Sequence, residues 1–448
     1  MEILSLGEKI RNRRRELDMT LKDLAGDRVT AGQLSFVELG KSNPSAELLK
    51  YIAERLQVDL DYLLESESAQ ARKICEYDIK MAQAYIYDKK YEDANELLDK
   101  SYDMAKRYGL ENMLGMIELN KGRIALDGNE YEKAAEYFLN ANVYFIENHC
   151  FSGEIDAYML MGETAYKRGV YELSLGYFNQ AKALYGMSGF CDDNLKAEIC
   201  FKICLCCINL NRLDEADEHL KCVEYYLNSI NDKSEYAHKL MSVSLTYRDS
   251  RNYEMALHYA DSALDFFREI DDMECLTKMK MDIGFIYSDK GDLDKSDYYL
   301  EDCKKNMSIR NVIDAAKIYL KLAYNDIRRN RFDKVKEHIK KSFELFVEDD
   351  DIDGQIECYS LLSDMYILKK EYSNCEEALN AGLSLLKSID KPFKLMKYYI
   401  KIGKYYGLMG DKQRQMEYMD KAYSMLSNMN LEIKSYKTTG HMANLSDF

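Results

Sequence analysis

The phrase "KKYEDA" occupies residues 89–94, and close variants of it recur along the chain. "NEYEKA" stands at 129–134, "GVYELS" at 169–174 and "RNYEMA" at 251–256. Each phrase places a tyrosine three positions before Ala or Ser. A fixed period between about 20 and 50 residues is typical of a repeat array in which each unit packs on its neighbours.

The register of this phrase extends over most of the chain. Successive spacings of 40, 40, 42, 40, 40, 39, 40 and 40 residues connect nine positions. These positions are Tyr91, Tyr131, Tyr171, Leu213, Tyr253, Leu293, Phe332, Tyr372 and Lys412. We expect each of them to begin the second helix of a helical hairpin.

Small residues flank these positions at fixed distances, as two closely crossing helices require. Nine residues earlier stand Ala82, Gly122, Gly162, Cys204, Ser244, Gly284, Ala323, Ser363 and Gly403. Three residues later stand Ala94, Ala134, Ser174, Ala216, Ala256, Ser296 and Cys375. With the large residues between them, this order resembles the tetratricopeptide repeat. The resemblance implies an all-α, right-handed superhelical solenoid of about nine hairpins with a period of ~40 residues over 72–428, followed by a polar C-terminal tail at 429–448.

Composition agrees with a helical protein that stays inside the cell. The 448 residues include 2 Pro and 22 Gly, and 47% are hydrophobic. Proline breaks helix interiors, so its scarcity favours helices. The sequence contains no apolar window long enough to span a membrane and no secretory leader, so we expect a cytoplasmic protein without a membrane partner. The 12 Cys are then reduced thiols.

The first 64 residues form a separate pattern of short helices. Apolar residues in "LGEKIRNRRREL" and "TLKDLA" predict two amphipathic helices, and Thr20 is placed as an N-cap with Asp23 three residues later. Thr30 is placed to cap a third helix, which "GKSNPS" at 40–45 ends. Two more helices are expected at 45–56 and about 59–64.

This stretch resembles the Cro/C1-type (XRE) helix-turn-helix family, through "LGEKIR", "TLKDLA", "ELGKSNPS" and the "LLKYIAERLQVDLDYL" ending. The resemblance implies a five-helix DNA-binding domain over 1–64, then a linker at 65–71. It also implies a buried ion pair between Arg14 and Glu38. The residues it assigns to bases or phosphates are Arg11, Arg13, Thr30, Ala31, Gly32, Gln33, Ser35, Phe36, Lys41 and Ser42.

Charge gives a mixed picture of DNA binding. The chain has a net charge of −16, whereas residues 1–64 hold ten Lys and Arg against eleven Asp and Glu. "KIRNRRR" at 9–15 is a basic patch, but the third helix, "TAGQLSFVEL", contains no Lys or Arg, and Leu21 replaces a usual phosphate-binding Gln of the family. A domain that binds protein instead of DNA is therefore an alternative.

The two parts together resemble the RRNPP family of peptide-responsive quorum-sensing regulators. The resemblance implies double-stranded operator DNA and a short linear signalling peptide as partners, and a homodimer formed through C-terminal repeats. The peptide would lie along the inner wall formed by the first helices of the hairpins. Polar candidates there are Asn120, Arg123, Asp156, Glu163, Tyr166, Asn209, Arg248, Asp249, Tyr324, Asn325 and Asp364. Two alternatives are a Rap-like regulator that binds a protein and does not read DNA, and a ligand-free repressor that uses the repeats for dimerisation only.

Other motifs point to no enzyme, cofactor or metal. Cys204 and Cys207 form a C-x-x-C with Cys200 on the same helical face, but we interpret them as packing residues because no second Cys pair or His partner stands nearby in the sequence. "DDDIDGQIECYS" at 349–360 starts like a calcium loop but has Ser360 where a Glu is required, so an acidic connection between repeats is expected. The six His are scattered, and no P-loop or nucleophile motif is present.

Overall fold

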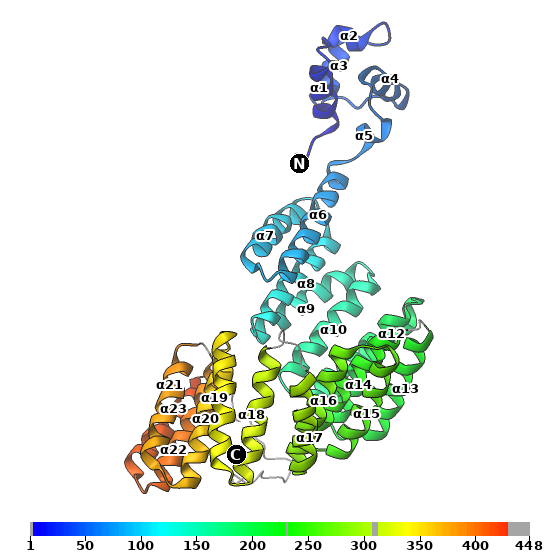
Figure 1. Cartoon of the computed structure of the whole chain (residues 1–448). Coiled ribbons are helices and arrows are strands. Elements are labelled where there is room, and N and C mark those ends of the chain that lie inside the picture. The colour runs from blue at the N-terminus through cyan, green and yellow to red at the C-terminus, as the bar shows by residue number, and fades with distance from the viewer. Residues whose placement is uncertain (1–2, 230–231, 307–311, 390, 429–448) are drawn as a thin grey trace. The chain divides into compact units, whose positions relative to one another are not determined.

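The protein is described by a computed structural model that covers residues 3–229, 232–306, 312–389 and 391–428, and these residues form helices without any strand (Figure 1). The chain divides into a first unit, Met1–Tyr236, and a second unit, Ala237–Phe448. None of the helices in the described ranges is long and apolar enough to cross a membrane.

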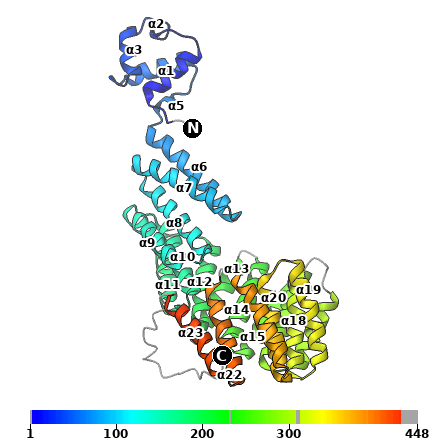
Figure 2. The same ribbon diagram turned by 90° about the vertical axis from the view of Figure 1, so that its left-hand side faces the viewer.

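The N-terminal helices of the first unit pack around one core. They are α1 (Leu6–Glu16), α2 (Leu21–Ala25), α3 (Ala31–Glu38), α4 (Ala46–Leu56) and α5 (Leu60–Leu64). Figure 2 shows α1, α2, α3 and α5 gathered together, with α6 leading away from them. Ile10, Leu24, Leu34, Ile52 and Leu56 are completely buried between them. We call α1–α5 the head, and all five helices lie where the sequence predicts them.

Hairpins make up the rest of the described chain. The first unit contains α6 (Glu67–Tyr87), α7 (Tyr91–Arg107), α8 (Glu111–Asp127), α9 (Tyr131–Glu147), α10 (Phe151–Lys167), α11 (Tyr171–Ser188), α12 (Asp193–Asn209) and α13 (Leu213–Ser229). Helix α14 (Lys233–Asp249) begins in the first unit. The second unit continues with α15 (Tyr253–Glu269), α16 (Met273–Lys290), α17 (Leu293–Asn306), α18 (Val312–Arg328), α19 (Phe332–Glu348), α20 (Ile352–Lys369), α21 (Tyr372–Lys387), α22 (Pro392–Leu408) and α23 (Lys412–Asn428).

All nine register residues begin the second helix of a hairpin, as predicted. The small residues nine positions earlier lie where the paired helices cross. A Cβ atom added at Gly122 would stand 2.4 Å from the Phe138 ring, and one added at Gly162 would stand 2.5 Å from Phe178. Such separations are far inside van der Waals contact, so only a residue without a side chain fits. The predicted fold class, a helix-turn-helix head followed by a helical repeat array, is confirmed.

The stretch predicted as a linker at 65–71 is mostly helical. Helix α6 begins at Glu67 because the Ser66 hydroxyl caps it by accepting a hydrogen bond from the backbone N–H of Ala69. Ala71 and Cys75 on this helix are completely buried. The prediction missed the helix because its apolar period starts only at Ala71, a full turn after the cap.

The acidic stretch at 349–360 is a helix start and not a cation loop. Asp351 caps α20 by accepting a hydrogen bond from the N–H of Gly354, 3.1 Å away. Asp353 already lies in the helix, where it forms ion pairs with Lys391 and Lys394. Only residues 349–351 form the expected acidic connection between repeats, and the rest of the stretch belongs to α20.

Candidate functional site

The exposed surface of α3 is the candidate DNA-facing surface of the head. Thr30 caps the helix, and its hydroxyl accepts a hydrogen bond from the N–H of Gln33 while the Gln33 side-chain oxygen accepts one from the N–H of Thr30. Phe36 is 53% exposed, which is unusual for a phenylalanine. The capping box occupies the Gln33 carbonyl oxygen, so only its amide NH2 remains to donate to a base.

The predicted ion pair between Arg14 and Glu38 holds α3 against α1. The two guanidinium contacts measure 2.6 Å and 3.0 Å, and Arg14 also donates to the Met19 carbonyl oxygen at 2.7 Å. Both side chains are almost entirely buried. The hydrogen bond to Glu38 raises the pKa of Arg14. This pair connects α3 to α1, as the helix-turn-helix resemblance implies.

The predicted phosphate-binding residues differ in how free they are. Arg11, Lys41 and Ser42 are exposed to water. Arg13 is partly occupied, because it donates to the Leu56 carbonyl oxygen at 3.2 Å and pairs with Glu16 at 2.8 Å. The remaining assigned residues lie on or beside α3: Ala31, Gly32 and Ser35.

Polar contacts connect the head to α6. The ammonium group of Lys9 is buried and donates to the carbonyl oxygens of Tyr62 and Glu65 at 2.7 and 2.8 Å. Burial lowers the pKa of Lys9, and the neighbouring Glu65 carboxylate opposes that effect. The Gln70 side chain on α6 binds both the N–H and the C=O of Leu4, at 3.0 and 2.9 Å. The sequence patterns did not predict this junction.

The candidate ligand residues of the first unit are only partly available. Asn120 is completely buried and donates to the Met116 carbonyl oxygen at 2.7 Å. Asn209 donates to the Tyr166 hydroxyl at 3.0 Å, which connects α12 to α10. Glu163 lies 3.9 Å from Lys167.

Arg123 and Asp156 interact electrostatically. The Asp156 side chain is exposed to solvent. Neighbouring protein atoms nevertheless displace part of its hydration and thereby raise its pKa. The positive charge of Arg123 on α8 partly offsets that rise. A carboxylate and a guanidinium from successive first helices therefore share one region of this unit.

A cavity of about 450 Å³ opens on the first helices of the second unit. All of its lining residues come from α14, α16, α18 and α20, the first helices of four consecutive hairpins. They are Arg248, Phe285, Asp289, Lys317, Leu320, Lys321, Tyr324, Glu357, Ser360, Leu361 and Asp364. Three of these, Arg248, Tyr324 and Asp364, belong to the predicted set.

Charges of both signs line this second-unit cavity. Lys321 contacts Asp289 at 2.6 Å and lies 5.1 Å from the centre of the Tyr324 ring. Lys401 from α22 binds Asp364 at 2.8 Å. Such a wall presents donors, acceptors and apolar faces within one opening.

Two acidic groups on the helices that line this cavity, Asp282 on α16 and Glu357 on α20, have raised pKa values. Burial raises the pKa of Asp282 to about 6, although Arg248 and Lys278 oppose the rise. Loss of hydration also raises the pKa of Glu357.

The other two candidates of the second unit do not line this cavity. Asn325 is completely buried, where its amide donates to Ser296 and Asp297 and its oxygen accepts from Ser288. The Asn325 side chain points between α16 and α17, and its assignment to a peptide stays a prediction. Asp249 is exposed and lies 3.4 Å from Arg248.

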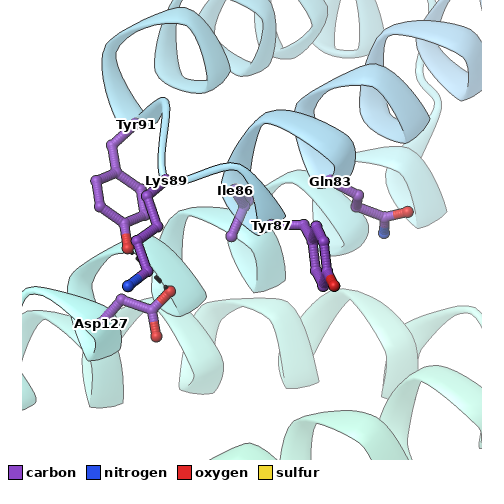
Figure 3. A pocket seen from close by; sticks show the side chains of 6 residues that line it. All are labelled: Gln83, Ile86, Tyr87, Lys89, Tyr91 and Asp127. Carbon is purple, nitrogen blue, oxygen red and sulfur yellow. Dashed lines mark hydrogen bonds between the residues drawn. The ribbon is translucent and has the colours of Figure 1, made fainter. Parts of the chain in front are cut away.

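A second, shallow pocket of about 550 Å³ lies at the turn between α6 and α7 (Figure 3). Its side chains are Gln83, Ile86, Tyr87, Lys89, Tyr91 and Asp127. The Tyr91 hydroxyl approaches Asp127 at 3.4 Å, and Tyr87 is 89% exposed. No charged group is buried in it, so we assign it no role. Among the side chains that the structure describes, no group of three or more His, Cys, Asp and Glu is placed to hold a metal ion.

Comparison with known families identifies the head. Residues 10–63 match the family model described as "Helix-turn-helix". The head is a helix-turn-helix domain. No curated protein sequence matches the chain.

Several solved structures are similar to this chain. The quorum sensor NprR from Bacillus thuringiensis, in its apo form, is 12% identical with a TM-score of 0.46, over 78% of this chain and 98% of NprR. RapI in its apo form is 14% identical with a TM-score of 0.47, over 79% of this chain and 98% of RapI. PlcR from Bacillus thuringiensis, in complex with a peptide and DNA, is 16% identical with a TM-score of 0.30, over 52% of this chain and 98% of PlcR.

Proposed function

We propose that this protein is a cytoplasmic transcriptional regulator whose helix-turn-helix domain binds operator DNA and whose repeats bind a short linear peptide. In this proposal two copies bind DNA together as a homodimer, because helix-turn-helix domains commonly recognise paired half-sites. The repeats act as the sensor and do not catalyse a reaction. The resemblance of the sequence to the RRNPP family supports this division of roles.

The second-unit cavity carries the peptide part of the proposal. Its lining comes only from first helices of four successive hairpins, the placement expected for a solenoid that holds an extended chain. An extended peptide needs partners for its backbone N–H and C=O groups and for its charged ends. Arg248, Lys321 and Asp364 offer such partners, while Phe285 and Leu361 offer apolar contacts.

The proposed peptide-binding set follows from exposure in each unit. In the second unit it keeps Arg248, Asp249, Tyr324 and Asp364. In the first unit it keeps Arg123, Asp156, Glu163, Tyr166 and Asn209. A buried amide reaches a ligand only if the surrounding helices move, so Asn120 and Asn325 are secondary candidates.

The DNA part of the proposal rests on the exposed surface of α3. Gln33 and Phe36 point to solvent, and the buried pair of Arg14 with Glu38 holds the helix in place. Gln33 would donate to a base edge, and Phe36 would pack on a thymine methyl group. Arg11, Lys41 and Ser42 would contact phosphates, with Thr30 and Ser35 beside them.

One observation favours the alternative of a Rap-like, protein-binding regulator. Helix α3 contains no Lys or Arg, and the oxygen of Gln33, its one base-reading amide, is engaged in the capping box. In that case the exposed Phe36 would contact a protein.

A DNA-binding experiment separates these functions. The full-length protein is titrated onto the DNA upstream of its own gene and onto a scrambled duplex of equal length, at several salt concentrations. The proposal expects a sequence-specific complex that weakens as salt rises. Equal affinity for both duplexes, or none, would favour the protein-binding alternative. Lys340→Ala, an exposed substitution in α19, serves as the control.

A thermal experiment tests the peptide. Synthetic segments of small open reading frames beside the gene are added to the protein, and a bound peptide should raise the Tm. Arg248→Ala with Asp364→Ala should abolish the shift, whereas Lys340→Ala should preserve it. A protein that binds operator DNA yet shows no shift with any segment would be the ligand-free repressor.

A further inference from the structure

The exposed side of α3 carries one amide and large apolar groups but no charge. Gly32, Gln33 and Phe36 are exposed to solvent, and Leu39 follows them at the end of the helix. Phe36 is 53% exposed and Leu39 is 55% exposed. The charged side chain of this helix, Glu38, is buried in an ion pair. A ligand of this surface therefore meets apolar carbon and one amide.

The capping box fixes how the Gln33 amide is presented. Its oxygen accepts hydrogen bonds from the Thr30 backbone N–H at 3.0 Å and from the Thr30 hydroxyl at 3.2 Å. The backbone N–H of Gln33 in turn donates to the Thr30 hydroxyl at 3.2 Å. Releasing the amide oxygen would leave the Thr30 N–H without its partner at the helix start. The side chain therefore offers a ligand its NH2, which is a donor.

This arrangement changes which base Gln33 can recognise. A glutamine reads adenine through two hydrogen bonds, in which its oxygen accepts from N6 while its NH2 donates to N7. Because Thr30 holds the oxygen, the first of these bonds is lost. The NH2 still matches the major-groove acceptors, which are N7 of the purines, O6 of guanine and O4 of thymine. Gln33 alone therefore gives adenine no advantage over guanine or thymine.

Phe36 adds the discrimination that Gln33 lacks. It lies three positions after Gln33, and residues three apart are neighbours on a helix surface. The apolar group that base pairs present in the major groove is the C5 methyl of thymine. Packing the exposed ring on that methyl removes apolar surface from water on both sides. Thymine thus provides a methyl group for Phe36 and, at O4, an acceptor for Gln33.

We infer that α3 reads thymine through its methyl group and that Phe36 is the residue that determines this specificity. The inference rests on the DNA-binding part of the proposed function and names the base that it selects. The Gln33 donor adds affinity with little discrimination. The methyl contact separates thymine from cytosine, which has no methyl group and presents a donor in place of O4.

The test compares two versions of one DNA fragment. The region upstream of the gene is amplified once with dTTP and once with dUTP, which keeps every base pair but removes the methyl groups. The full-length protein is titrated onto both duplexes and binding is followed by fluorescence anisotropy. Loss of one methyl contact should weaken binding roughly fourfold per head, and roughly fifteenfold for two heads. Because a methyl group carries no charge, the ratio of the two affinities should stay constant as salt rises.

Two variants separate the roles of the side chains. Phe36→Ala should bind both duplexes with equal affinity. Gln33→Ala should weaken binding to both by the same factor and keep the preference for the methylated base. Tyr77→Ala removes an exposed aromatic ring on α6 and should behave like the native protein. Circular dichroism verifies that each variant is folded.

Three results would contradict the inference. A sequence-specific complex of equal affinity on both duplexes would show that the methyl group is not read, while the proposed DNA binding would stand. A preference that persists in Phe36→Ala would mean that another residue, or the shape of the DNA, reports the methyl group. Absence of a sequence-specific complex on either duplex would refute the DNA-binding proposal itself, and Phe36 would then be a contact for a protein.

Discussion

At the scale of single residues, the positions where the two helices of a hairpin cross leave the least space for a side chain. Gly162→Ala would place a methyl group against the Phe178 ring, and we expect a loss of stability of about 1–3 kcal/mol. Gly176→Ala is the matched control: its Cβ meets nothing within 4 Å inside α11, so alanine should stabilise the helix by about 0.5–1 kcal/mol. Urea unfolding measures both. Equal destabilisation by the two changes would contradict the packing account.

Asp282 gives the stability of the second unit a dependence on pH. Its folded pKa, about 6, lies above the ordinary value of 3.8 because of burial. A raised folded pKa contributes stability that is complete below about pH 4 and is lost as pH rises through 6. Asp282→Asn should therefore match the native protein at pH 4 and exceed its stability at pH 8, by on the order of 2 kcal/mol.

Thermal unfolding at the two pH values tests this prediction. Asp265→Asn, an exposed substitution in α15, controls for net charge. A pH-independent difference between the Asp282→Asn variant and the native protein would mean that its carboxylate is not desolvated.

Residue roles could be predicted where a family pattern fixes the geometry, and not where packing decides. The contact of Arg14 with Glu38 follows from the resemblance of the head. The burial of Asn325 does not, because its column faces either the groove or the next helix depending on the local crossing.

At the scale of elements, the first residues of the chain and α6 form one connected junction. Lys9→Met would leave the carbonyl oxygens of Tyr62 and Glu65 without their donor, and we expect the head to lose roughly 2 kcal/mol. Hydrogen exchange should then accelerate in α1 and α5. Lys50→Met, on the exposed side of α4, should leave exchange unchanged. Unaltered protection in the Lys9→Met variant would show that the junction contributes little.

Helix boundaries in the repeats were predictable because most units share the same local pattern. A register residue with a small residue nine positions earlier, and in seven of the nine units a small residue three positions later, marks each turn. The start of α6 could not be predicted in this way, because the helix is longer than the other first helices and Ser66 caps it. Sequence periodicity determines repeated elements better than it determines their first member.

At the scale of the whole molecule, acidity limits how DNA can be bound. The net charge is −16, and each head offers Arg11 and Lys41 as its free candidate phosphate ligands. Two heads would then neutralise about four phosphates, so log K should fall against log salt with a slope of about −4. Lys41→Ala should make the slope shallower by about two in a dimer. Fluorescence anisotropy between 50 and 200 mM salt measures this, and a slope steeper than about −8 would reveal other cations at the DNA.

The even spacing of the register residues has an evolutionary consequence. From Tyr131 to Val170 the chain contains one complete period, and the next period begins again with a tyrosine at 171. Duplicating or deleting such a segment in frame joins helix positions that are equivalent in neighbouring repeats, so the packing between repeats can be preserved. Deleting a single amino acid inside a helix instead shifts the later side chains of that helix around its axis. The spacings of 39 and 42 residues show that the connections between helices accommodate one or two residues. We therefore expect changes in the length of this gene to be whole multiples of about forty codons, or a few codons at the connections.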